Sequence, residues 1–399
     1  MAILNASSSI NDSAFGLFTE GKTAKLTIGD PAAGNADYDS AYTVAFFSNS
    51  VIGADASTHL NQIDIEGSYL EISTIEPNVT GENFGFATGL TNTTPSDVSR
   101  LYKFSYAAAP VFIASDVGNM AVCHHNGSGS TSGNEGFAAA GQLGPGGAPA
   151  HKQIDKFPFA ISSGTAIDVG DLAAVANYLV GHTSELYGFS TGGGFGYSGP
   201  ASSIERYPFA INSGTAIDIA DMYPFGYDHA GHSSSTHGYA SGGRHPSIPV
   251  PYDVFQTTKK FPFAITTGSS TSAQNLTERK FSAYGHSSNT DAYVSGGFPS
   301  GFSGGTIGST SIDKFPFANN NNATSVGDLS TSPSIGQHFV RSGTNNSKTT
   351  AFAHGAMPTT YGSATNIMSF PFAISSGNAT QVGTFSGITS FEGSLGVDD

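Results

Sequence analysis

The sequence predicts an all-β fold assembled from a unit that occurs six times along the chain. One observation is a recurring phrase, HTSELYGFSTGG at 182–193, HSSSTHGYASGG at 232–243 and HSSNTDAYVSGG at 286–297. Another is the pentapeptide KFPFA or a close variant, which begins at 103, 156, 206, 260, 314 and 369 and so recurs every 50 to 55 residues. A fixed period of this length indicates a repeated supersecondary unit.

Each unit contains four short segments with the composition of β-strands. In the third unit these segments are 176–182, 186–193, 202–210 and 215–222. They are rich in aromatic and β-branched residues and are bounded by Gly, Ser or Asn, as strands usually are. No segment has a sustained apolar stripe at a spacing of 3.6 residues, which excludes amphipathic helices. Links such as ISSGT at 161–165 carry a Gly for positive φ and are typical of hairpin turns.

A four-stranded antiparallel unit of about fifty residues is typical of a β-propeller blade, because radial stacking buries both faces of each sheet. Six units therefore predict a six-bladed propeller. The first unit begins at its second strand, ENFGFATGL (82–90), and the chain ends with a spare first strand, GITSFEGSLG (387–396). We expect these ends to share one blade, which removes the free sheet edges.

The N-terminal part of the chain does not follow the repeat. We assign residues 1–80 to a small β-rich attachment segment and residues 81–399 to the propeller, with N-terminal strands expected in TAKLTIGD (23–30) and YTVAFFSNSVIG (42–53). The stretch 58–73 faintly echoes a blade, so a degenerate seventh blade is the alternative.

The FPF motif places two aromatic rings on the same face of one strand, since residues i and i+2 of a strand share a face. These rings should pack between neighbouring sheets. The Pro between them donates no ladder hydrogen bond, so the motif should lie at a strand end or a bulge. The ten repeat positions are Phe157, Phe159, Tyr207, Phe209, Phe261, Phe263, Phe315, Phe317, Phe370 and Phe372.

The composition excludes several classes of partner. The chain has 15 Lys and Arg against 30 Asp and Glu, a formal charge of −15, which would repel a phosphate backbone, so no nucleic acid is expected. It has no run of eighteen apolar residues and no basic start, so we expect no membrane insertion and no secretory signal. The single Cys123 has no partner for an intramolecular disulfide and is expected to be a small buried side chain.

Three histidines recur at one position of the repeat, His182, His232 and His286. If they line the central channel, three imidazoles on a ring are a candidate metal site. In the simpler interpretation, each His caps its own hairpin through a backbone carbonyl or a hydroxyl.

Two sets of carboxylates recur in the fourth strand, and a pair of histidines follows Cys123. The carboxylates suit calcium between blades, although turn hydrogen bonds are the simpler interpretation; they are Asp116, Asp168 and Asp218, with Asp171, Asp221 and Asp328 three residues beyond that position. His124 and His125 lack the spacing of a zinc site, so we attribute their adjacency to chance.

Long Gly-rich loops differ from one unit to the next, at 141–150, 244–253, 298–308 and 341–350. Variable loops on a repetitive scaffold usually carry the binding function. Their aromatic residues Tyr252, Phe298 and Phe302 are candidates for stacking on sugars, or for packing against a neighbouring subunit.

The phrase GYASGG (238–243) resembles kelch-type propellers, although the chain has no Trp. The longer series HSSSTHGYASGG, IDKFPFA and IDVGDL resembles propeller repeats of structural proteins of marine bacteriophages and cyanophages. The resemblance implies a virion protein, in a tail fibre, an appendage or a capsid decoration, and brings no catalytic residues.

We therefore expect a non-enzymatic virion structural protein without a cofactor, which presents its propeller for host-surface or inter-subunit binding. Its expected partners are other virion proteins and host surface glycans or a receptor, in a homo-oligomer or a multicopy assembly. The alternative function is that of an extracellular carbohydrate-binding or sugar-active kelch-type propeller.

Overall fold

The computed structural model describes the chain in fifteen stretches. They are residues 3–5, 23–29, 43–46, 69–75, 83–88, 99–107, 112–144, 149–194, 202–223, 226–245, 254–299, 308–329, 344–354, 366–385 and 395–398, and those before 80 and after 394 are described by their backbone alone. By its internal contacts the chain divides into two units, Met1–Pro77 and Asn78–Asp399.

The first unit is one antiparallel sheet with the strand order β1-β4-β2-β3. Its strands are β1 (Ile3–Asn5), β2 (Thr23–Gly29), β3 (Thr43–Phe46) and β4 (Tyr69–Ile75). Strands β2 and β3 are present where the sequence predicts them, although β3 is shorter than expected. The order is not that of an up-and-down blade, so this sheet is not a seventh copy of the repeat.

The second unit contains six four-stranded antiparallel blades, and we call the strands of each blade a to d in the order in which they pair. Blade 1 is β28 (Leu395–Asp398), β5 (Phe84–Thr88), β6 (Arg100–Ser105) and β7 (Phe112–Asn119); blade 2 is β8 (Ser128–Thr131), β9 (Glu135–Gln142), β10 (Ala150–Pro158) and β11 (Ile167–Asp171); blade 3 is β12 (Val180–Thr183), β13 (Tyr187–Thr191), β14 (Ser203–Pro208) and β15 (Ile217–Asp221). Blade 4 is β16 (Ala230–Ser233), β17 (His237–Ser241), β18 (Thr257–Pro262) and β19 (Thr271–Asn275); blade 5 is β20 (Tyr284–Ser287), β21 (Asp291–Ser295), β22 (Ser311–Pro316) and β23 (Thr324–Asp328); blade 6 is β24 (Thr344–Asn346), β25 (Thr350–His354), β26 (Asn366–Pro371) and β27 (Thr380–Phe385).

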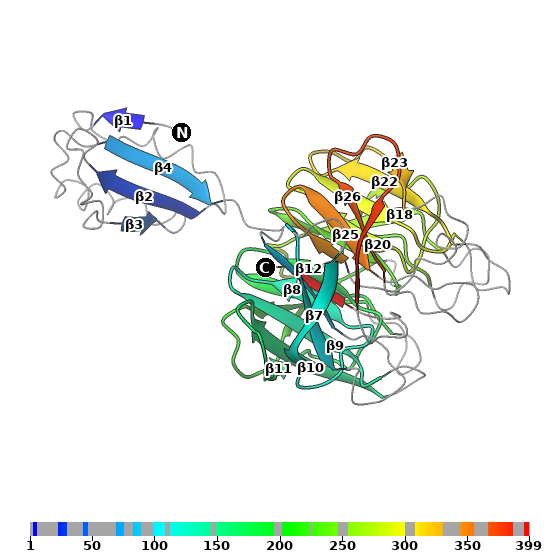
Figure 1. Ribbon diagram of the computed structural model, residues 1–399, viewed down its shortest axis with the longest axis horizontal. Helices are drawn as coiled ribbons and strands as arrows, with labels where there is room; N and C mark the ends of the chain where they lie inside the picture. The colour runs from blue at the N-terminus through cyan, green and yellow to red at the C-terminus, as the bar shows by residue number, and fades with distance from the viewer. Residues whose placement is uncertain are drawn as a thin grey trace. The chain divides into compact units, whose positions relative to one another are not determined.

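The blades close into a ring. Each a strand contacts the a strands of both neighbouring blades, in the cyclic order β28, β8, β12, β16, β20, β24 and back to β28. The C-terminus lies near β8 (Figure 1), because β28 pairs with β5 and serves as the a strand of blade 1. The six-bladed prediction and the closure by a C-terminal strand are confirmed. That strand begins at Leu395, later than the expected 387–396.

The seam between the first and last blades carries a second connection. Strand β27 of blade 6 pairs in parallel with β7 of blade 1, from Gly383 opposite Phe112 to Phe385 opposite Ala114. The two blades therefore form one continuous eight-stranded sheet. This pairing covers two d-strand edges that would otherwise be open for association.

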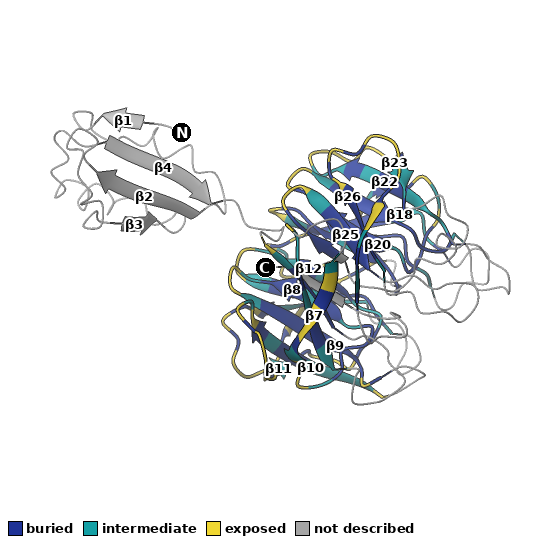
Figure 2. Cartoon of the chain, in the orientation of Figure 1, coloured by how far each residue is buried: buried dark blue, intermediate teal, exposed yellow. Residues whose placement is uncertain are grey.

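Aromatic stacking holds adjacent blades together. In blade 3 the b-strand ring of Phe189 lies 5.8 Å from Phe261 and 4.9 Å from Phe263, the FPF rings of blade 4. The same contact joins Phe86 to Phe157 and Phe159, Phe137 to Tyr207 and Phe209, Tyr239 to Phe315 and Phe317, Tyr293 to Phe370 and Phe372, and Phe352 to Phe104 and Tyr106. Such pairs contribute about 1 kcal/mol each beyond their buried area. Most of these rings are buried, while Phe159, Phe317 and Tyr106 are partly exposed. Figure 2 shows that buried residues run through the strands of the blades.

The Pro of the FPF motif is the last residue of strand c in five blades, at Pro158, Pro208, Pro262, Pro316 and Pro371. The motif therefore lies at a strand end, as the missing N–H donor requires.

Glycines bring the a strands into backbone contact. A Cβ atom placed on Gly181 would lie 1.9 Å from the carbonyl oxygen of Gly129, and one on Gly285 would lie 2.2 Å from that of Gly231. Real Cβ atoms do not approach this closely, so the inner ring requires glycine at these positions.

The two ends of the propeller differ in their connections. Because the strands alternate in direction, all a–b and c–d turns lie at one end and all b–c and d–a linkers at the other. The a–b turns of blades 2 to 6 have three residues each, as in 132–134 and 184–186. The b–c linkers range from seven residues (143–149) to fifteen (242–256 and 296–310). We call this second side the loop-bearing end.

Candidate functional site

Four of the d–a linkers at the loop-bearing end share their length and one backbone feature. In four blades the linker has eight residues, 120–127, 172–179, 222–229 and 276–283. The seventh residue of each has a positive φ of 52 to 59°, at Asn126, Tyr178, Asp228 and Ser282. Because the linkers match, residues at the same place in them are structurally equivalent. The fifth place is held by His124, Ala176, Gly226 and Lys280.

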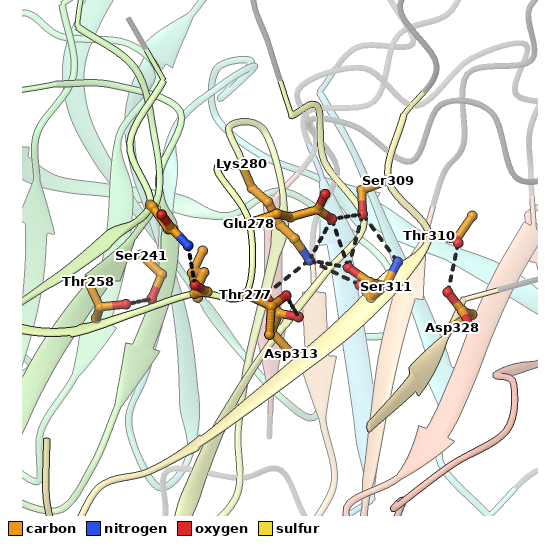
Figure 3. Close-up of polar contacts among 12 residues, drawn as sticks. Ser241, Thr258, Thr277, Glu278, Lys280, Ser309, Thr310, Ser311, Asp313 and Asp328 are labelled. Carbon is orange, nitrogen blue, oxygen red and sulfur yellow. Dashed lines mark hydrogen bonds and ion pairs between the residues drawn. The ribbon is translucent and has the colours of Figure 1, made fainter. Parts of the chain in front are cut away.

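Lys280 lies at the centre of a buried polar cluster between blades 4 and 5 (Figure 3). Its side chain is fully buried, and its Nζ lies 3.4 Å from Oδ2 of Asp313, which is also fully buried. The same Nζ donates to Ser311 Oγ at 2.6 Å and to the Ser311 carbonyl at 3.3 Å. Glu278, whose side chain is 40% exposed, places Oε1 at 3.8 Å from Nζ. The cluster thus joins a buried amine to one buried carboxyl and one that reaches solvent.

Hydrogen bonds fix both carboxyl groups of this cluster. Thr277 donates its backbone N–H to Asp313 Oδ2 at 3.1 Å and its hydroxyl to Oδ1 at 2.6 Å. Ser309 and Ser311 donate to Oε1 of Glu278 at 2.5 and 3.0 Å. Burial lowers the pKa of Lys280, against the opposing effect of the nearby Asp313 and Glu278 charges.

A similar pair stands between blades 1 and 2. His124 Nδ1 lies 2.8 Å from the carbonyl of Ala140 and must donate to it, while Nε2 lies 3.1 Å from Oδ2 of Asp155, with both side chains fully buried. Burial opposes the ionisation of Asp155, but the contact with His124 outweighs it and lowers the pKa of this carboxyl group. Asp155 also accepts from Val122 N–H at 3.1 Å and Gln153 Nε2 at 2.8 Å.

The acidic residue two positions before the FPF motif is a recurring contact between blades, which the sequence analysis missed. Asp155, Glu205 and Asp313 each accept a backbone N–H from the d–a linker of the preceding blade. The linker before Glu205 has Ala176 at the place that Lys280 and His124 hold in the other two, and burial raises the pKa of Glu205. The signal was present in the phrases IDKFPFA and IERYPFA, where an acidic residue precedes each aromatic pair.

The repeated histidines form a ladder of hydrogen bonds along the inner strands and do not converge on one point. His182 Nδ1 lies 3.0 Å from the carbonyl of His232, and His232 Nδ1 lies 3.1 Å from that of His286. A carbonyl only accepts, so each Nδ1 donates and each Nε2 accepts a hydroxyl, from Thr191 at 2.9 Å and Ser241 at 3.1 Å.

The ladder continues into blades 5 and 6. His286 Nε2 lies 3.1 Å from Ser295 Oγ, and Asn345 holds the corresponding position in blade 6, where it bonds Nε2 of His354 at 2.9 Å. Burial lowers the pKa of His182 to about 4 and those of His232, His286 and His354 to about 3. These imidazoles are neutral connectors between blades.

The strand-d carboxylates bond locally. Asp116 and Asp168 accept the backbone N–H two residues further on, at 3.1 and 3.0 Å from Gly118 and Gly170. Asp218 stands at the same place in β15, where burial raises its pKa. Asp171 pairs with Lys152 at 3.3 Å, while Asp221 and Asp328 accept hydroxyls from Ser202 and Thr310 at 2.6 and 2.8 Å. Within the described stretches no three His, Cys, Asp or Glu side chains are grouped to hold a metal ion.

The loop aromatics have different positions. Tyr252 and Phe302 lie outside the described residues. Phe298 is only 2% exposed and packs on Phe281 at 5.4 Å between ring centroids. The expectation that Phe298 stacks on a sugar or packs against a neighbouring subunit is wrong, because this ring is part of a small apolar cluster with Val254 and Phe281. Cys123 is buried, and burial raises its thiol pKa to about 11, so it is not a reactive thiolate.

The fold and the repeat define the class: a six-bladed β-propeller. The chain is similar to the solved structure of YjhT, with a TM-score of 0.55 and 10% sequence identity over 70% of this chain and 88% of that one. A likeness at this identity shows the fold alone. No protein-family model and no curated protein matches the sequence. None of the helices in the described part of the chain is long and apolar enough to span a membrane.

Proposed function

We propose that the protein is a non-enzymatic binding module that recognises carbohydrate through the loop-bearing end of its propeller. The observation that carries this proposal is the asymmetry between the two ends. The a–b turns of blades 2 to 6 are uniform at three residues, whereas the b–c linkers vary from seven to fifteen residues and differ in sequence beyond the Gly-Gly with which three of them begin. A scaffold that keeps one end constant and varies the other concentrates its recognition at the variable end.

The composition of the chain favours a sugar over other ligands. Charged residues make up only 11% of the chain, and its surface is supplied largely by Ser, Thr, Asn and Gly. Hydroxyl and amide groups match the donors and acceptors of a glycan. The two longest linkers carry Tyr252 and Phe302, whose rings supply the apolar faces on which sugars stack. The kelch-type fold agrees with this function without proving it.

A glycan array tests the proposal. We expect the purified chain to bind a restricted group of glycans, and Tyr252→Ala or Phe302→Ala to weaken that binding at least tenfold. The matched control is Leu186→Ala, in an a–b turn at the opposite end, where the side chain is 63% exposed. Binding that is absent, or equally affected by all three variants, contradicts the proposal.

A second candidate function is display on a virion, and the two-unit organisation of the chain favours it. Residues Met1–Pro77 form a separate unit with its own four-stranded sheet. A module of this kind suits anchoring to an assembly, while multicopy display would raise the avidity of weak contacts made by the propeller.

Mass spectrometry of purified phage particles from the same source tests this second candidate, with the chain expected at a defined stoichiometry. Deletion of residues 1–77 should leave a soluble propeller that no longer joins particles. Finding the chain only free in solution or on cell envelopes would exclude the virion assignment.

A further inference from the structure

Lys280 and Asp313 form a buried ion pair at a place where a hydrogen bond alone would join blades 4 and 5. Both side chains are fully buried, and Nζ lies 3.4 Å from Oδ2. Removing an amine and a carboxyl group from water is costly, and apolar replacements often serve stability equally well. At the equivalent place in blade 2 the fold has Ala176, and Glu205 still accepts its backbone N–H from Ala173 at 2.6 Å. The connection between blades therefore does not require a lysine.

We propose that Lys280 and Asp313 condense into an amide, which covalently ties the d–a linker of blade 4 to strand c of blade 5. The lone pair of Nζ attacks Cγ of Asp313, so one C–N bond forms and one C–O bond breaks. The ammonium and carboxylate together supply the atoms of one water molecule, and the product is a neutral amide. No oxidant, cofactor or other reactant is needed.

The surrounding residues supply what the condensation requires. The amine must lose its proton before it attacks, and burial lowers the pKa of Lys280. Glu278 Oε1 lies 3.8 Å from Nζ, so this carboxylate relays two of the three ammonium protons, one after the other, to the departing oxygen of Asp313, which leaves as water, while the third proton stays on the amide nitrogen. Ser309 and Ser311 hold Oε1 in place, and the 40% exposure of Glu278 gives the released water a route out.

Thr277 prepares the other reactant. Its N–H and hydroxyl bond the two oxygens of Asp313 at 3.1 and 2.6 Å, which fixes the carboxyl group and stabilises negative charge on oxygen during the attack. Ser311 Oγ, at 2.6 Å from Nζ, aims the amine. The amine and the carboxyl group of Asp313 are thus held in contact, at 3.4 Å between Nζ and Oδ2, and such positioning is what a condensation between two side chains requires.

Peptide mass spectrometry of the folded, full-length chain tests the proposal. Residues 281–313 contain no Lys or Arg, so trypsin cuts an unlinked chain after Lys280 and Lys314 and releases 281–314. The cross-link blocks cleavage at Lys280. We expect the peptide 280–314, lighter by one water molecule, in place of 281–314. Peptide 281–314 at its full mass would overturn the proposal.

A second protease distinguishes this bond from water loss at another residue. Chymotrypsin cuts after Tyr and Phe, including Tyr293, and would open the loop. The fragment with Lys280 should then remain joined to the fragment with Asp313. Two separate fragments, with the water missing from one of them, would contradict the amide.

Variants assign the roles. Lys280→Arg and Asp313→Ala should abolish the water loss, while the matched control Lys260→Arg, on strand c of blade 4, should retain it. Glu278→Gln should slow linkage by a factor on the order of a hundred, the usual contribution of a general acid–base. If the first two variants fail to fold, the mass of the wild-type peptide and the rate of linkage in Glu278→Gln still test the proposal. An unchanged rate in Glu278→Gln would overturn the role of Glu278.

Discussion

The histidine ladder makes the stability of the propeller steeply dependent on pH. The imidazoles of His182, His232, His286 and His354 are buried and neutral, with the pKa of the first lowered to about 4 and those of the others to about 3. Among the described residues, these imidazoles face aromatic rings and uncharged polar side chains, which are Thr191, Ser241, Ser295, Asn345 and Asn346. His229 adds a like charge near His182. Burial is the main cause of all four shifts.

The sign of the pH effect follows from the direction of the shifts. The unfolded imidazoles titrate near their ordinary pKa of about 6.5, whereas burial lowers the pKa of the folded ones to about 4 for His182 and about 3 for the other three. Between about pH 4 and pH 6.5 the unfolded chain therefore binds more protons, and the free energy of unfolding falls as the pH falls. Each imidazole contributes about 1.4 kcal/mol per pH unit in this window. Four of them lower stability by about 5 kcal/mol between pH 5.5 and pH 4.5, which is comparable to the whole stability of many domains.

Urea unfolding followed by circular dichroism measures this slope at a series of pH values between 4.5 and 8. The informative variant is His232→Asn, because Asn345 occupies the corresponding place in blade 6. It should reduce the proton uptake on unfolding by about one, and its offset from wild type should be constant above pH 7. The reasoning would be refuted if the wild-type chain took up less than one proton on unfolding in this pH range. It would also be refuted if His232→Asn left the proton uptake unchanged.

Three further predictions concern the ring itself. Phe261→Ala removes a fully buried ring between blades 3 and 4, and we expect it to lower the free energy of unfolding in urea by about 4 kcal/mol. The control is Ile217→Ala, at a side chain that is 61% exposed, which should change that free energy by less than about 0.5 kcal/mol. Gly181→Ala places a methyl group against the Gly129 carbonyl, so we expect less soluble, folded protein. A midpoint of thermal unfolding equal to that of wild type would contradict the close contact. Deletion of 395–399 removes β28 and should expose the edge of β5, which native-state hydrogen exchange detects as loss of protection in blade 1 but not in blade 4.

The repeat could be recognised in the sequence because the strands, the turns and the aromatic core residues all recur with the same period. The FPF spacing set the number of blades, the Pro marked the end of strand c, and the missing first strand at residue 82 indicated closure by the C-terminus. These features depend on local chemistry, which periodicity reports directly. The later start of β28, at Leu395, depends on register with β5, which composition does not specify.

The polar contacts between blades were harder to predict, because they depend on which residues the ring closure brings together. Lys280 and Asp313 lie 33 positions apart, and neither stands out in the sequence from an ordinary surface charge. Phe298 follows two glycines in a loop-like phrase, yet Phe281 from another linker buries it. The histidines repeat visibly, but whether they meet at one ion or bond from blade to blade is decided by strand geometry.

A direct binding titration with a linker exchange tests the proposed function most sharply. The exchange replaces residues 299–307 of the fifteen-residue linker of blade 5 with Gly and Ser, which keeps the buried Phe298, the Ser309 contact with Glu278 and the six blades in place. With the best ligand from the glycan array, we predict saturable binding to wild type and at least a tenfold loss in the exchanged chain, with an unchanged circular dichroism spectrum. Equal affinity of the two chains would contradict recognition through the loop-bearing end.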